Sequence, residues 1–159
     1  MVRKDQARTF GLVGPIARAS GVEIDLRKLA PYAAYDTIEF TVPVEPQGDG
    51  YARLRIFFRE AEQAAKVVRQ ALASLTAGET APPRVAWREG VALGAVEAPH
   101  GAALHWLRLN DDGTVARYRI APPSFANWRG FLLAVERFAF QDFPIILASF
   151  GLSNAESDR

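Results

Sequence analysis

The sequence has 159 residues, 49% hydrophobic and 23% charged, which is typical of an ordinary globular protein and excludes a disordered or fibrous chain. The formal net charge is only +1 and the basic residues are spread along the chain, which argues against nucleic acid as a partner. Cysteine is absent, so the chain has no disulfide, no thiolate nucleophile and no cysteine-ligated metal, and no segment is long and apolar enough for direct membrane insertion.

The N-terminal third is irregular in pattern. Asp5 to Phe10 predicts a short helix, which Gly11, Gly14 and Pro15 interrupt. Residues 16–50 carry several prolines and glycines and predict a loop-rich stretch, with one weak strand edge at 38–44. A loop of this length inside a compact domain is usually functional or wraps against a partner.

A long amphipathic helix follows. Apolar residues recur at intervals of three and four from Tyr51 to Leu75, the period of one helix face. The Asp49 side chain is placed to cap the first turn, and Gly78 suits the end of the helix. Such a helix has about 25 residues and a length of about 38 Å.

The next elements are short strands. After a linker-like break at 80–83, strands are expected at 94–99, 102–109 and 115–121, and Asn110 to Gly113 predict a tight turn between the last two. Both faces of this hairpin are half apolar, which predicts that both are covered.

The last part of the chain is helical in pattern. Ser124 is placed to cap a second helix that runs through Phe140, and Pro144 suits the first turn of a third, very apolar helix at 145–150. The fold class is therefore α+β: a long amphipathic helix, a small antiparallel hairpin or sheet and C-terminal helices. The size predicts a single domain over residues 1–159.

Three segments resemble a known family. "GLVGPIARASGVEIDLRKLAPYAAYD" (11–36) is similar to G-x-x-G-P-x-x-R-A-S-G-x-x-x-D-L-R-K-x-x-P-Y-x-x-Y-D in the quinone-site (49 kDa) subunit of respiratory complex I. "VEAPHGAALHW" (96–106) resembles the E-A-P-R-G stretch of [NiFe] hydrogenase large subunits, and "YRIAPPSFANW" (118–128) is similar to both families. The resemblance covers roughly residues 6 to 159, and it extends to energy-converting hydrogenases of the formate hydrogenlyase type.

The resemblance implies a C-terminal portion of a hydrogenase-large-subunit-like fold whose N-terminal half is absent. It implies a domain of an NADH:quinone oxidoreductase or energy-converting hydrogenase complex, inactive in isolation, on the inner, cytoplasmic face of the membrane. The implied partners are an iron-sulfur small subunit and membrane subunits, with electron transfer toward quinone and no cofactor bound by this chain itself. The alternative is a non-catalytic scaffold domain that keeps the docking surface and has lost the chemistry.

The C-terminal segment "GLSNAESDR" indicates whether the chain could hold the nickel-iron centre of a hydrogenase. When this segment is aligned with the C-terminal motifs of the two families, Ser153 and Glu156 stand where a hydrogenase has its two terminal cysteines. Glu156, Asp158 and Arg159 match the complex I motif. Nickel in hydrogenases is held by thiolates, and a serine hydroxyl or a lone carboxylate is a poor substitute. We therefore expect no metal ligand and no nickel-iron centre on this chain.

Three residues are candidates for acid–base chemistry. His100 stands where the hydrogenase motif has arginine, and it either relays protons or supports the turn. Glu97 either carries protons with a raised pKa or stays ionised beside a partner such as Arg119. Glu156 either lines the site or joins a solvated ion cluster with its C-terminal neighbours.

A second set of residues comes from the family segment and the C-terminus. The resemblance implies that they face a partner or the quinone cavity, while the alternative for the basic residues near the N-terminus is that they brace the irregular loop by binding its carbonyl groups. These residues are Arg18, Asp25, Arg27, Lys28, Asp158 and Arg159.

Overall fold

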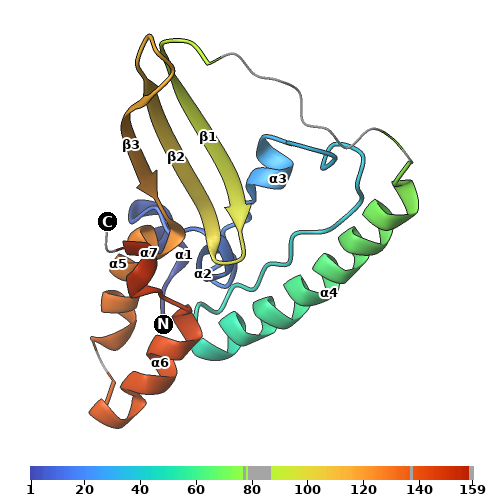
Figure 1. Cartoon of the computed structure of the whole chain (residues 1–159). Helices are drawn as coiled ribbons and strands as arrows, with labels where there is room; N and C mark the ends of the chain where they lie inside the picture. Colours follow the sequence, from blue (N-terminus) through green and yellow to red (C-terminus); the bar gives the residue numbers. More distant parts are fainter. Residues whose placement is uncertain (77, 79–86, 137, 158–159) are drawn as a thin grey trace.

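The computed structural model describes residues 1–76, 78, 87–136 and 138–157. It confirms the α+β class, with one long helix, a three-stranded antiparallel sheet and C-terminal helices (Figure 1). The elements in chain order are α1 (Lys4–Thr9), α2 (Gly14–Arg18), α3 (Leu26–Leu29), α4 (Gly50–Ser74), β1 (Gly90–Ala98), β2 (Gly101–Leu109), β3 (Val115–Ala121), α5 (Pro123–Val135), η1 (Phe140–Asp142), α6 (Phe143–Phe150) and α7 (Asn154–Ser157). The break predicted at 80–83 lies outside the described residues.

The sheet has the order β1-β2-β3, and both pairs are antiparallel. β2 and β3 agree with the predicted hairpin, while β1 starts at Gly90, four residues before the expected start. The prediction that both faces are covered is wrong, because β1 and β3 are exposed over most of their length. The sheet is buried only near its lower end in Figure 1, around Gly101 and Ala103, where α2 and α5 pack against β2.

The short helix predicted near the N-terminus is α1, which ends at Thr9 before Gly11 as expected; Pro15 stands in the first turn of the next helix, α2, where a missing N–H costs no helical hydrogen bond. One expectation in this part of the chain is wrong, because residues 38–44 form no strand. The backbone N–H groups of Glu39 and Thr41 instead donate to the side-chain oxygens of Gln70 and Gln63 on α4, at 2.9 and 3.1 Å.

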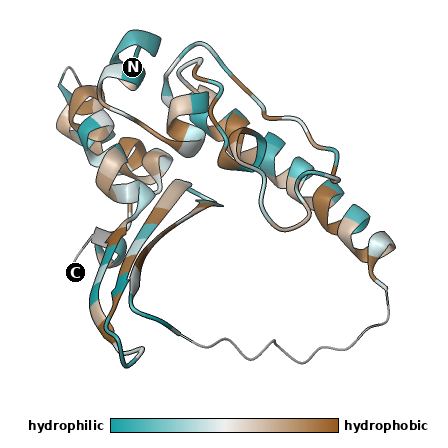
Figure 2. Ribbon diagram, turned by 90° about the horizontal axis from the view of Figure 1, so that it is seen from above, coloured by the Kyte–Doolittle hydropathy of each residue, from teal (hydrophilic) through white to brown (hydrophobic). Residues whose placement is uncertain are grey.

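The long helix begins as expected and ends early. The Asp49 carboxylate accepts from the Ala52 N–H at 2.7 Å. The last helical residue is Ser74, since the backbone of Leu75 is already extended, so Gly78 does not end the helix. Among its residues only Ala52, Arg53 and Ile56 are buried, and Figure 2 shows apolar residues distributed along the outer part of α4, away from the sheet.

The hydrophobic core lies among the N-terminal helices and α5 and α6. Ile16, Phe131 and Phe150 are its large buried side chains, and the two phenylalanine rings meet edge to face. The helix predicted through Phe140 ends at Val135, and a short 3-10 turn follows. Its N-cap is Pro122 and not Ser124, while Pro144 stands in the first turn of α6 as predicted.

Candidate functional site

The turn between β1 and β2 meets the C-terminal segment. His100 lies in this turn, and its Nδ1 is 3.9 Å from a carboxylate oxygen of Glu156 in α7. Both side chains are about one third exposed. The imidazole packs against Gly151, whose left-handed backbone (φ 59°) ends α6 and brings the chain back toward the turn. Two of the three candidate acid–base residues are therefore neighbours.

Ser124 links two residues of the C-terminal segment, Ser153 and Glu156. Its hydroxyl donates to the Glu156 carboxylate at 2.6 Å and accepts from the Ser153 N–H at 3.0 Å. The Ser153 hydroxyl in turn accepts from the Glu156 N–H at 3.3 Å, which caps α7. Ser124 was predicted only as a helix cap, because no local pattern indicates that residues 124 and 153 are close.

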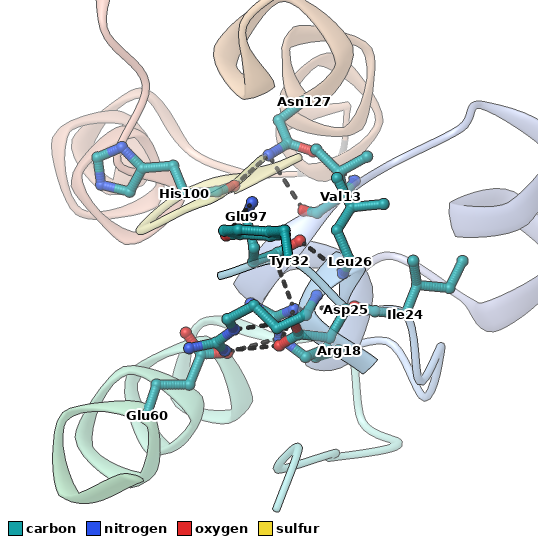
Figure 3. Close-up of polar contacts among 11 residues, drawn as sticks. Val13, Arg18, Ile24, Asp25, Leu26, Tyr32, Glu60, Glu97, His100 and Asn127 are labelled. Atoms are coloured by element: carbon teal, nitrogen blue, oxygen red, sulfur yellow. Dashed lines mark hydrogen bonds and ion pairs between the residues drawn. The ribbon is translucent and has the colours of Figure 1, made fainter. Parts of the chain in front are cut away.

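Glu97, the third candidate, belongs to a different cluster. Its carboxylate accepts from the Arg18 guanidinium at 2.9 Å and from the Leu26 N–H at 3.1 Å. The expected partner Arg119 is not adjacent, because it stands on β3 opposite Trp106, whereas β1 pairs only with β2. Figure 3 shows Glu97 directed toward Arg18, with the His100 imidazole on the far side of the turn.

Arg18 is the centre of this buried ion cluster, which we define as Arg18, Asp25, Arg27, Glu60 and Glu97. The Arg18 side chain is 1% exposed. It contacts Glu60 at 2.6 Å and Asp25 at 3.5 Å, and it donates to the Ile24 carbonyl at 2.8 Å. The contact with Ile24 is the loop-bracing role that was one of the two predicted alternatives.

The basic residues of α3 are also held within the chain. The Arg27 guanidinium contacts Asp25 at 2.6 Å and lies over the Phe40 ring at 4.8 Å, and the Lys28 amine lies over the same ring at 4.1 Å. Lys28 is exposed, so it remains accessible for docking. Asp158 and Arg159 lie outside the described residues, and the partner-facing role of the whole set stays a prediction.

The environment of the cluster shifts the pKa of Glu60 and the pKa of Asp25 in opposite directions. Burial raises the pKa of Glu60, and the Arg18 charge offsets this only in part. At Asp25 burial also opposes ionisation, but the hydrogen bonds and charge of Arg27 outweigh it and lower the pKa. Two carboxyl groups of one cluster therefore differ in their readiness to bind a proton.

Three residues of these sites were missed from the sequence. Asn127, fully buried, accepts from the Val13 N–H at 3.0 Å and donates to the carbonyl of Val13, and so ties α5 to the start of α2. The Tyr32 hydroxyl accepts from the Glu97 N–H at 3.0 Å. One feature of the sequence could have identified Glu60: it is a charged residue on the same helix face as the apolar residues Phe57 and Ala64.

Two hollows lie beside α4. A cavity of about 300 Å³ is lined by cluster residues together with Phe57, Ala61 and Ala64. A mostly apolar cavity of about 700 Å³ lies between the start of α4 and α6. Arg53, on its wall, is buried and donates to the Ser149 hydroxyl at 2.8 Å; burial lowers its pKa to about 10.

Within the described part of the chain, no helix is both long and apolar enough to cross a bilayer. The same residues contain no group of three or more His, Asp or Glu side chains arranged to hold a metal ion.

A family model described as the 49 kDa subunit of respiratory-chain NADH dehydrogenase matches residues 1–89 and 80–159. One NADH-quinone oxidoreductase subunit, from Syntrophobacter fumaroxidans, is 36% identical over 100% of this chain and 44% of its own length. The corresponding subunit from Desulfotalea psychrophila is 34% identical over 96% of the chain and 42% of its own length. The carbon monoxide-induced hydrogenase of Rhodospirillum rubrum is 33% identical over 88% of the chain and 39% of its own length. The chain thus spans less than half the length of these relatives.

Proposed function

Because this chain belongs to the family of the 49 kDa subunit of respiratory-chain NADH dehydrogenase, we propose that residues 1–159 form one domain, the C-terminal portion of the large subunit of a complex I-like oxidoreductase. In this proposal the domain docks an iron-sulfur subunit and takes part in electron transfer toward quinone. The assembly sits against the inner face of the cytoplasmic membrane through separate membrane subunits.

The observation that carries the proposal is the meeting of the β1–β2 turn with the C-terminal segment. The two segments are about fifty residues apart in sequence, yet they bring a titratable imidazole and a carboxylate to within 3.9 Å. An imidazole and a carboxyl group can each donate or accept a proton, so this pair is suited to pass a proton to or from a substrate that is reduced beside it. Reduction of a quinone consumes protons as well as electrons.

The proposal includes no nickel-iron centre on this chain, although one of its relatives is named a hydrogenase. Cysteine is absent from the whole sequence, so no thiolate is available from it. Ser153 and Glu156 supply only hard oxygen atoms, and these are engaged with Ser124 and with each other. Nickel in a redox-active site requires softer ligands.

A quinone titration on the assembled complex tests the proposal. The full-length protein that carries this domain is purified from membranes with its partners, and a short-chain quinone and a competing inhibitor are titrated against electron transfer. We expect co-purifying iron, saturable quinone dependence and no stoichiometric nickel. His100→Gln should lower turnover and shift its pH profile, whereas the matched variant His105→Gln, on the exposed sheet, should not.

The scaffold alternative has its own support in the buried ion cluster, because Arg18 and Asp25 face the interior and hold the fold. A pure scaffold would assemble with its partners and show no saturable quinone or inhibitor binding. Nickel in stoichiometric amount, bound through this domain, would contradict both proposals.

A further inference from the structure

The buried ion cluster contains more acids than bases. Asp25, Glu60 and Glu97 are three carboxylates, and Arg18 and Arg27 are two guanidiniums, so the fully ionised cluster has a net charge of −1. Arg18, Asp25 and Glu97 have side chains at most 3% exposed, and that of Glu60 is 17% exposed. An uncompensated charge in such surroundings is costly, and proteins commonly avoid it by binding a proton.

The three carboxylates are not held equally. Asp25 accepts three hydrogen bonds from Arg27, at 2.6 to 3.0 Å. Glu97 uses both of its oxygens, one toward Arg18 and one toward the Leu26 N–H. Within the described residues the Glu60 carboxylate accepts a single hydrogen bond, from Arg18 Nε to Oε1. Its Oε2 is therefore the oxygen on which a proton displaces no N–H donor of the cluster.

Glu60 also has a route for proton exchange. It lines the cavity of about 300 Å³ next to the apolar side chains of Phe57, Ala61 and Ala64. This cavity is large enough for several water molecules, and the Arg18 guanidinium engages the Oε1 atom of the carboxyl group. The apolar wall disfavours the ionised form of the carboxyl group.

We propose that Glu60 is the proton-binding site of this cluster: as the pH is lowered, its Oε2 takes a proton from water in the cavity, and the cluster becomes neutral. The Oε1 atom still accepts from Arg18, so the contacts of Arg18 with Glu97 and the Ile24 carbonyl are retained. Glu97, the sequence candidate for proton transfer, keeps its hydrogen bonds with Arg18 and with the Leu26 N–H. This protonation belongs to the fold of the chain and does not depend on the proposed function.

The charges that face Glu60 agree with this assignment. They are Arg18 from α2, Asp25 and Arg27 from the start of α3, and Glu97 from the end of β1. Burial raises the pKa of Glu60, the Asp25 charge raises it further, and the two arginines lower it by less. The net effect of these charges and of burial is a raised pKa of Glu60, which favours the neutral acid.

Infrared spectroscopy tests the site directly. The protein is titrated between pH 5 and pH 9 while the C=O stretching band of protonated carboxyl groups is recorded. We expect this band to grow as the pH falls from 9 to 5 in the unmodified protein and in Glu62→Gln, an exposed neighbour on the same helix, and to be lost in Glu60→Gln. A band that survives unchanged in Glu60→Gln, or no band between pH 5 and pH 9 in the unmodified protein, would overturn the proposal.

Thermal unfolding of two variants gives an independent test. A group with a raised pKa in the folded state contributes stability that is present at low pH and is lost as the pH rises through that pKa. The difference in melting temperature between Glu60→Gln and the unmodified protein should therefore increase in favour of the variant from pH 5 to pH 8. Glu97→Gln should have a lower melting temperature than the unmodified protein at pH 5 and at pH 8. Equal losses in the two variants, or a Glu60→Gln variant that does not fold, would show that Glu60 is an ordinary ionised partner of Arg18.

Discussion

The guanidinium of Arg18 is almost completely buried. Its removal leaves the carboxylates of Asp25, Glu60 and Glu97 without their common partner. Breaking a buried ion pair from one side costs about 3–5 kcal/mol, because the remaining charges stay desolvated. We expect Arg18→Met to lower the free energy of unfolding by about that amount in urea denaturation. Arg3→Met, which removes an exposed pair with Asp5, should cost at most about 1 kcal/mol. Similar losses for both variants would contradict the buried role of Arg18.

Asp25 gives the cluster its acid sensitivity. Burial opposes its ionisation, but the Arg27 contacts outweigh that effect and lower its pKa below the ordinary value of 3.8. A lowered pKa contributes stability that is present above the unfolded value and is lost as the pH falls through the folded value. Asp25→Asn should therefore flatten the loss of stability below pH 3.8, measured as the melting temperature against pH. An unchanged acid limb would show that other carboxylates govern acid unfolding.

Gly14 is a backbone position that the sequence alone would treat as a simple interruption. It has a φ of 62°, and a Cβ atom there would overlap the His100 carbonyl. We expect Gly14→Ala to destabilise the protein and to displace the β1–β2 turn, seen as a changed chemical shift of the His100 ring in NMR spectra. Gly11→Ala provides the control, because Gly11 also has a positive φ but no neighbour within 4 Å.

Among the helices and strands, α4 is defined by its N-cap. The Asp49 carboxylate satisfies the Ala52 N–H, and such caps are worth about 1 kcal/mol. Asp49→Ala should lower the stability by about that amount in chemical denaturation, and Asp49→Ser, which retains an acceptor, should recover most of it. If the two variants are equally destabilised, the charge of Asp49 near Arg53 matters more than its cap.

The long helix also explains why residues 38–44 are extended without belonging to the sheet. Alternating residues there suggested a strand edge, but no strand is adjacent. The side chains of Gln63 and Gln70 on α4 supply the partners that a neighbouring strand would provide. A local pattern specifies an extended backbone, whereas its hydrogen-bonding partner is set by the elements that pack beside it.

At the scale of the whole molecule, α4 carries an exposed apolar stripe. The residues of the stripe are three and four positions apart in strict alternation. The stripe consists of Tyr51, Leu54, Phe58, Ala61, Ala65, Val68 and Leu72 on the helix and of Leu75 directly after it, and all of these are exposed. This is the repeat that packs two helices side by side, and exposed apolar surface of this extent favours association.

We expect the 159-residue chain, expressed alone, to self-associate through this stripe. Phe58→Glu places a charge in its middle and should shift the chain toward the monomer in sedimentation velocity experiments. Lys66→Glu, on the same helix but away from the stripe, should leave the association unchanged. A chain that is monomeric without substitution would show that the stripe does not drive association.

Local sequence was sufficient to predict the α+β class, the position and cap of α4, the β2–β3 hairpin, the helix opened by Pro144 and the family. These features depend on periodicity, on turn and cap residues, and on motifs that are contiguous in the chain. Which side chains meet became known only from the folded arrangement: Glu97 and Arg18 are 79 residues apart in sequence, and Ser124 lies 32 residues from Glu156. The partner of a charged group, and therefore its pKa and its chemistry, depends on packing between distant segments, which no local pattern records.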